Sequence, residues 1–102
     1  MEKVLVKNAA DPGQVKEAKQ KELRGREREV NDVRSILNTR EGRRFMWKML
    51  GHCRVFESIW HGSAQIHYNA GMQDVGHFIL AEITEASPEA YLLMMKENKG
   101  EN

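Results

Sequence analysis

Few side chains in this sequence could do chemistry. Four histidines and one cysteine are the only soft or borderline metal ligands: His52, Cys53, His61, His67 and His77. A zinc site needs three or four ligands that converge on one ion, but helix neighbours such as His52 and Cys53 point about 100° apart. Helical spacing also directs Cys53 toward the core, where a thiol behaves as a small hydrophobic group. We therefore predict no metal ligands, no catalytic residues and no cofactor, and we expect that the protein is not an enzyme.

The block from Gly42 to Met49 has instead the composition of a contact surface, because it holds two arginines, two aromatic residues and two methionines. At 100° per residue, Arg43, Trp47 and Arg54 lie within about 40° of one another, facing away from the expected core. Tryptophan and arginine dominate interface hot spots, and they can also stack on bases or bind phosphate. We predict a partner-binding surface formed by Arg43, Arg44, Trp47, Lys48 and Arg54. The alternative is a local arginine–tryptophan contact that only covers the indole.

A second candidate surface is a basic ridge on the preceding helix. Lys16, Arg24 and Arg28 follow one face at helical spacing, and nucleic acid could lie against them. Interspersed glutamates weaken the attraction to phosphate, so a solvated face of mixed charge is the alternative. The same helix also carries Leu23 and Val30, whose apolar seam could dock against another subunit.

The composition restricts the class of protein further. The 102 residues include 16 basic and 15 acidic side chains, so no net field steers the whole chain toward nucleic acid or an anionic membrane. Protein contact is therefore favoured over nucleic acid for the arginine–tryptophan surface. A single cysteine excludes an intramolecular disulfide, and the apolar trio Val4, Leu5 and Val6 is too short for a signal sequence or a membrane span.

Helical periodicity predicts an all-α domain of three to four helices. Asp11 and Pro12 predict the start of a long charged helix whose first half projects from the core. We divide the chain into an N-terminal arm (1–13), the projecting charged helix (14–31), a helical core domain (32–98) and a tail (99–102).

The second helix is predicted from about Arg40 to Arg54 after a Thr39 cap, with its core face formed by Phe45, Met46, Met49 and Cys53. The loop that follows contains Phe56, Ile59 and Trp60, which we expect to fold back over the core; Trp60 is also a candidate for partner binding.

A third helix is predicted from near Ser63, and a short fourth helix opens at Ser87 and Pro88. The apolar stripe of the third helix is formed by Tyr68, Met72, Val75, Ile79, Ile83 and Ala86. Gly71 and Gly76 interrupt this helix, which indicates the close approach of another helix or a bend.

Several motifs follow one another from Asp32 onward: Asp32-Val33-Arg34-Ser35-Ile36-Leu37, Gly42-Arg43-Arg44-Phe45-Met46-Trp47-Lys48-Met49-Leu50, Tyr68-Asn69-Ala70-Gly71 and Pro88-Glu89-Ala90-Tyr91. In this order they resemble a family of small proteins encoded among the virion-structure genes of short-tailed bacteriophages, typified by a Bordetella phage protein. The resemblance covers roughly two-thirds of the chain and leaves out the charged helix. Gln73 departs from it, since relatives tend to carry a basic residue there.

Members of that family look like structural-module proteins without an assigned enzymatic role, so the resemblance carries over no catalytic residues. It implies a non-enzymatic virion protein, made in the host cytoplasm and present in repeated copies. Its place would be at the portal or head–tail axis, or inside the capsid for ejection with the genome. Its expected partners are portal, tail or internal proteins, with DNA nearby. The alternative is a small nucleic-acid-binding or regulatory helical protein made during infection.

Overall fold

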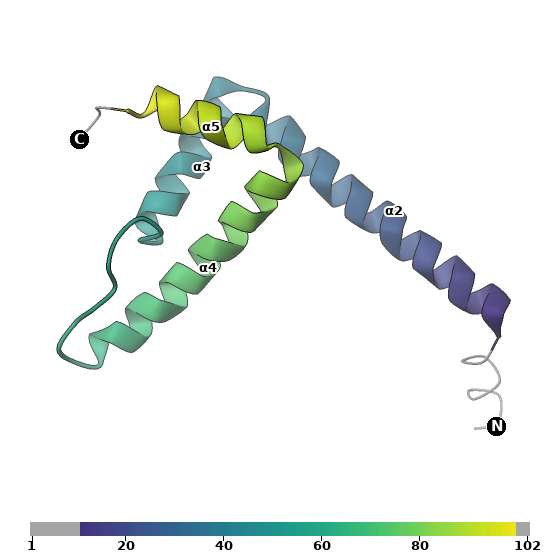
Figure 1. The fold of residues 1–102 in the computed structure, drawn as a ribbon, viewed down its shortest axis with the longest axis horizontal. Coiled ribbons are helices and arrows are strands. Elements are labelled where there is room, and N and C mark those ends of the chain that lie inside the picture. Colours follow the sequence, from purple (N-terminus) through teal and green to yellow (C-terminus); the bar gives the residue numbers. More distant parts are fainter. Residues whose placement is uncertain (1–10, 100–102) are drawn as a thin grey trace.

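The structure, a computed structural model, describes residues 11–99 and contains four helices and no strand in that range. The predicted arm up to residue 10 and the tail from residue 100 lie outside the described residues. Helix α2 spans Pro12–Leu37, α3 spans Arg40–His52, α4 spans Gln65–Ala86 and α5 spans Pro88–Glu97 (Figure 1). The prediction of a small all-α fold is confirmed.

The starts of three helices follow from local sequence. The Asp11 side chain accepts a hydrogen bond from the backbone N–H of Gly13, and Thr39 accepts one from Gly42. Ser87 accepts one from Ala90 at the start of α5. Each cap satisfies a backbone donor that has no partner inside its own helix. These caps confirm the three helix starts that the sequence predicts.

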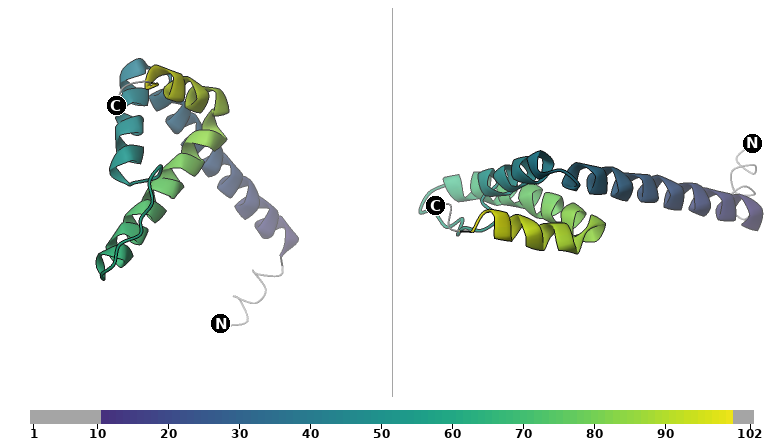
Figure 2. Two further views of the ribbon diagram at one scale, coloured as in Figure 1. Left: turned by 60° about the vertical axis from the view of Figure 1, so that its left-hand side comes forward. Right: turned by 90° about the horizontal axis from the view of Figure 1, so that it is seen from above.

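The helices form a flat molecule that measures 61 × 39 × 16 Å. Helices α2 and α4 meet near the C-terminal end of α4 and then diverge, so that the N-terminal half of α2 extends away from the other helices (Figure 1). Helix α3 runs beside α4, and α5 crosses the end where all four helices meet (Figures 1 and 2). The radius of gyration, 19.7 Å, exceeds the value of about 13 Å expected for a compact domain of this length.

The core lies where the four helices meet. It is formed by Leu37 of α2, Leu50 of α3, Ile83 and Ala86 of α4, and Met94 of α5. Partly buried residues, including Val30, Val33, Met46 and Trp47, pack against this cluster. A core of this size stabilises only the junction of the helices, and the parts of α2 and α4 beyond it receive little cover.

One core assignment made from the sequence is wrong, and part of the apolar stripe predicted for the third helix is exposed. Phe45 is 57% exposed, because the buried face of α3 is centred on Leu50 and Phe45 lies about 140° from it. On α4, Ile83 and Ala86 of the predicted stripe are buried, but Tyr68 and Val75 are 61% and 55% exposed. The chain therefore covers the C-terminal end of the stripe fully and its N-terminal part incompletely.

The prediction of a close approach is confirmed for Gly76 and not for Gly71. Gly76 is buried, and a Cβ atom there would lie 2.6 Å from Cβ of Cys53 and would also collide with Val55. Gly71 has no heavy atom within 4 Å of the same position. The end of α3 therefore rests directly on the backbone of α4.

Candidate interaction surfaces

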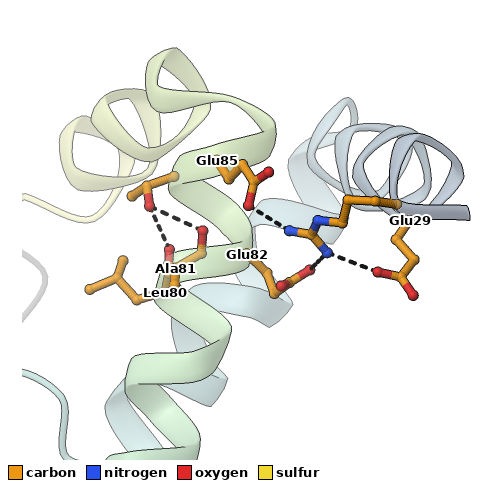
Figure 3. Close-up of polar contacts among 7 residues, drawn as sticks. Glu29, Leu80, Ala81, Glu82 and Glu85 are labelled. Atoms are coloured by element: carbon orange, nitrogen blue, oxygen red, sulfur yellow. Dashed lines mark hydrogen bonds and ion pairs between the residues drawn. The ribbon is translucent and has the colours of Figure 1, made fainter. Parts of the chain in front are cut away.

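An ionic cluster fastens α2 to α4. The Arg26 guanidinium lies 2.6 Å from a carboxylate oxygen of Glu85, 3.1 Å from Glu82 and 2.9 Å from Glu29 of its own helix (Figure 3). Hydrogen bonds to Glu85, Glu82 and Glu29, in that order, raise the pKa of Arg26. Three carboxylates surround one cation, so the cluster keeps a net charge of −2. Helix α2 is thus docked at Arg26, within the range 14–31 that the sequence assigns to the projecting helix.

Arg43 is committed to a contact within the chain. Its guanidinium donates to both oxygens of Glu97 on α5, at 3.1 and 2.7 Å, and also to the carbonyl oxygen of Leu37 at 3.0 Å. The side chains of Arg43 and Glu97 are only 13% and 16% exposed. The hydrogen bond from Arg43 lowers the pKa of Glu97, and the same contact raises that of Arg43. This pair ties α3 to α5 and leaves Arg43 with little surface to offer a partner.

Trp47 lies against the core and not on an outer face, which corrects the orientation predicted from the sequence. It packs against the buried cluster, and its ring stacks on Phe56 with centroids 5.1 Å apart and an angle of 28° between the rings. The helical wheel failed because its predicted core face was centred on Phe45. The positions of the two aromatic residues are the reverse of those predicted, because the Trp47 indole is partly buried and Phe45 is exposed.

Arg44 and Lys48 remain exposed on α3, on the same side as Phe45. Arg54 does not join them, because α3 ends at His52 and Arg54 has a positive φ of 59°. Its guanidinium lies 3.7 Å from Glu57. The outward surface of α3 is therefore formed by Phe45 between two cations, and not by Trp47 as predicted from the sequence.

The loop from 53 to 62 is held by two amide side chains of α4, Gln73 and Asn69, whose contact with this loop was not predicted from the sequence. Gln73 donates to the carbonyl oxygens of Arg54 and Glu57, at 2.7 and 3.1 Å. Asn69, which is 4% exposed, donates to the carbonyl oxygen of Ile59 at 3.2 Å. Backbone groups without helical partners need such donors. In the sequence, the spacing of four residues between Asn69 and Gln73, shortly after the predicted loop, could have indicated that one side of the helix binds the loop backbone.

Trp60 lies at the end of this loop and is 76% exposed, so it does not fold back over the core as predicted. Phe56 is 50% exposed and Ile59 is partly buried. Exposure of a tryptophan on a loop is compatible with the partner-binding role that the sequence suggests for it.

Helix α4 carries an uncovered apolar surface. Tyr68, Val75 and Phe78 are 61%, 55% and 65% exposed. Together with Gly71 they follow a spacing of 3, 4 and 3 residues, which keeps them on one side of the helix. The next positions in the same spacing are Glu82 and Glu85, which bind Arg26 of α2. The exposed stripe therefore continues the side of α4 against which α2 is docked.

The projecting half of α2 carries the other predicted residues. Leu23 is 69% exposed and Val15 is 41% exposed, and Lys16, Arg24 and Arg28 are also exposed. Val30, in contrast, packs against the chain's own core and is not free for a partner. On α5, Leu92, Leu93 and Met95 line a shallow hollow on the outer side of the helix.

Within residues 11–99, no group of three or more histidine, cysteine or acidic side chains is placed to hold a metal ion. In the same range, no helix combines the length and the apolar character that crossing a membrane requires.

These features define a small all-α protein whose helices are fixed by ionic contacts and whose apolar faces are partly uncovered. The chain belongs to the family of Bbp19-like phage proteins, since the model of that family matches residues 33–96, more than half of its length. The match runs from the C-terminal part of α2 through α3 and α4 into α5. The resemblance seen in the sequence motifs is thereby confirmed. Comparison with curated proteins and with solved structures finds no match.

Proposed function

We propose that this phage protein is a non-enzymatic structural or assembly subunit of the virion. The observation that carries the proposal is the balance between exposed and buried apolar side chains. Among the described residues, twelve large hydrophobic side chains are exposed, whereas only six hydrophobic residues are buried. Soluble monomers rarely leave large contiguous apolar patches uncovered, and such patches mark interaction sites. A subunit whose neighbours complete its packing fits this balance.

Its place is at the portal or head–tail axis, or inside the capsid as a protein ejected with the genome. The surfaces that serve it there are the α4 stripe, the Arg44–Phe45–Lys48 side of α3, Trp60 and the projecting part of α2 with Leu23. Repeated copies of the chain are part of the proposal, because phage particles are built from symmetric arrays. Portal, tail or internal virion proteins are the other partners.

Mass spectrometry of purified phage particles tests this function. We expect the protein in particles purified through a density gradient, at more than one copy per particle. Comparison of full particles with particles that have ejected their DNA separates the two locations, because an ejected protein is lost with the genome. Recovery only from infected-cell lysates, and never from purified particles, would refute a virion role.

The alternative is a nucleic-acid-binding or regulatory protein, which the exposed Lys16, Arg24 and Arg28 favour. Glu17, Glu22 and Glu27 alternate with these cations and reduce their attraction to phosphate. Binding to duplex DNA that falls steeply as salt is raised, and that is lost when the three cations are replaced by glutamine, would support this alternative over the structural role.

A further inference from the structure

Helices α2 and α4 diverge from their contact (Figure 1), and both carry exposed apolar side chains beyond the point where they separate. On α4 the exposed stripe is Tyr68, Val75 and Phe78, and on α2 the exposed apolar residues are Val15 and Leu23. On each helix these residues continue the side that makes the α2–α4 contact, past the point where the two helices separate (Figure 1). Each arm therefore presents half of a helix–helix interface that its own chain does not complete.

We propose that the projecting part of α2, residues 12–25, of a second copy of this chain packs along the exposed stripe of α4. This inference specifies the contact between the repeated copies in the proposed function, and to that extent it rests on that function. The chain cannot make this contact with itself, because its own α2 points away from the N-terminal half of its own α4 (Figure 1).

The dimensions of the two surfaces match. At 1.5 Å per residue, the stripe from Tyr68 to Phe78 is about 15 Å long, and Val15 and Leu23 are separated by about 12 Å along α2. The incoming helix would place one apolar residue near each end of the stripe. Gly71, which has no heavy atom within 4 Å of its Cβ position, lies in the middle and allows close approach of a helix backbone.

The charges of the two surfaces are complementary. Residues 12–25 contain four basic and two acidic side chains, which gives a net charge of +2. From Gln65 to Ala81, Asp74 is the single charged residue, so an apolar helix face can be covered there without burying many charges. At the end of the stripe, the Arg26 cluster keeps a net charge of −2, and its Glu85 and Glu29 side chains are 57% and 66% exposed. The lysines of an incoming α2 would meet these carboxylates.

The contact joins two different surfaces, so it is heterologous. Each copy offers its α2 to one neighbour and its α4 stripe to another, and repetition gives a ring or an open array and not only a dimer. This property separates the proposal from a symmetric pairing of two α2 helices or of two α4 stripes.

Sedimentation of the purified full-length chain, over a wide range of concentrations, tests the inference. We expect the wild-type chain to form oligomers larger than a dimer. Leu23→Lys and Phe78→Lys should each weaken self-association by about 30-fold or more, the loss typical of a hot-spot residue. Leu92→Lys is the matched control, because Leu92 is also well exposed but lies on α5, outside the proposed contact, and it should leave the mass unchanged. Circular dichroism should show that the variants remain folded, because all of the altered positions are exposed.

Mixing the two variants gives the decisive result. Phe78→Lys retains a functional α2 and Leu23→Lys retains a functional α4 stripe, so an equimolar mixture should form a one-to-one complex and nothing larger. A monomeric wild-type chain, loss of association in only one of the two variants, or no complex in the mixture would overturn the proposal. A chain that is monomeric alone yet present in purified particles would refute this contact and leave the virion function standing.

Discussion

Replacement of Gly76 by alanine should loosen the packing of α3 on α4. In an open helix this change is stabilising, by up to about 1 kcal/mol, because glycine has the lower helix propensity. At Gly76, however, the new Cβ would lie 2.6 Å from Cβ of Cys53 and would collide with Val55. Overpacking of this kind typically costs about 1 to 3 kcal/mol. We therefore expect a net loss of up to about 2 kcal/mol in the free energy of unfolding.

Gly71→Ala is the matched control, since it makes the same chemical change in the same helix where no heavy atom lies within 4 Å. Both substitutions are best made in the Phe78→Lys background, so that self-association does not contribute. Urea unfolding followed by circular dichroism gives the two free energies. We expect Gly71→Ala to be neutral or stabilising, and the two variants to differ by about 1 to 3 kcal/mol. Equal stabilisation by both changes would refute the close approach of Cys53 and Val55.

Three further predictions concern the ionic contacts, Trp47 and α2. Arg43 lowers the pKa of Glu97 below its ordinary value of 4.5, so the ionised contact stabilises the fold at pH values above 4.5. As the pH falls below 4.5, Glu97 becomes protonated and the melting temperature should decrease. Glu97→Gln should make the melting temperature less dependent on pH in this range. Trp47→Ala should lower the free energy of unfolding by about 2 kcal/mol, which is less than the ~3 to 5 kcal/mol lost when a fully buried tryptophan is truncated. Phe45→Ala should lower it by under about 0.5 kcal/mol, because Phe45 is exposed. Equal losses in urea unfolding would contradict this placement of the two side chains. Hydrogen exchange in the monomeric Phe78→Lys variant should be fast over residues 12–25 and slow over residues 30–37. The reason is that helix segments without packing contacts are only marginally stable in water. Slow exchange throughout α2 would contradict the prediction that residues 12–25 are unstable in the monomer.

The helices themselves were predictable because their signals are local. Asp11, Thr39 and Ser87 act as caps through hydrogen bonds to backbone groups two or three residues away, so the sequence contains all the information needed. The glycine at position 76 was predictable for a related reason. Glycine lowers the stability of a helix, so its presence indicates that another part of the chain packs too closely there for a Cβ atom. The sequence alone could not identify Cys53 and Val55 as that part.

The orientation of α3 was not predictable, because the choice depends on other helices. Two faces of α3 are apolar enough to be buried, one with Phe45 and Met49 and one with Trp47 and Leu50. The contact of Arg43 with Glu97, 54 residues later, favours the second face. The sequence of α3 contains no information about the position of Glu97 in α5. A helical wheel of α3 alone therefore cannot decide which of its two apolar faces is buried.

The α4 stripe shows a second limit of periodicity. A period of 3.6 residues identifies the side of a helix that must be covered, but it does not say which chain covers it. The apolar stripe predicted from the sequence runs from Tyr68 to Ala86, and the chain buries Ile83 and Ala86 while it leaves Tyr68 and Val75 exposed. Exposure of the N-terminal half was knowable only once the direction of α2 was known.

The direction of α2 is itself set by charged residues and not by a large core. Arg26 binds Glu82 and Glu85 at the edge of the junction, where the buried cluster no longer reaches, and only Leu37 of α2 is fully buried. Neutralising those glutamates would therefore weaken the hold on α2 at Arg26 and leave its C-terminal part held by Val30, Val33 and Leu37. A fixed angle between α4 and the docked part of α2 matters for the proposed contact, because it sets the direction in which residues 12–25 extend and so lowers the entropy cost of binding, even where those residues become ordered only in the contact. The Arg26 cluster thus acts twice, by fixing the helix that one copy offers and by supplying the carboxylates that the next copy's lysines would meet.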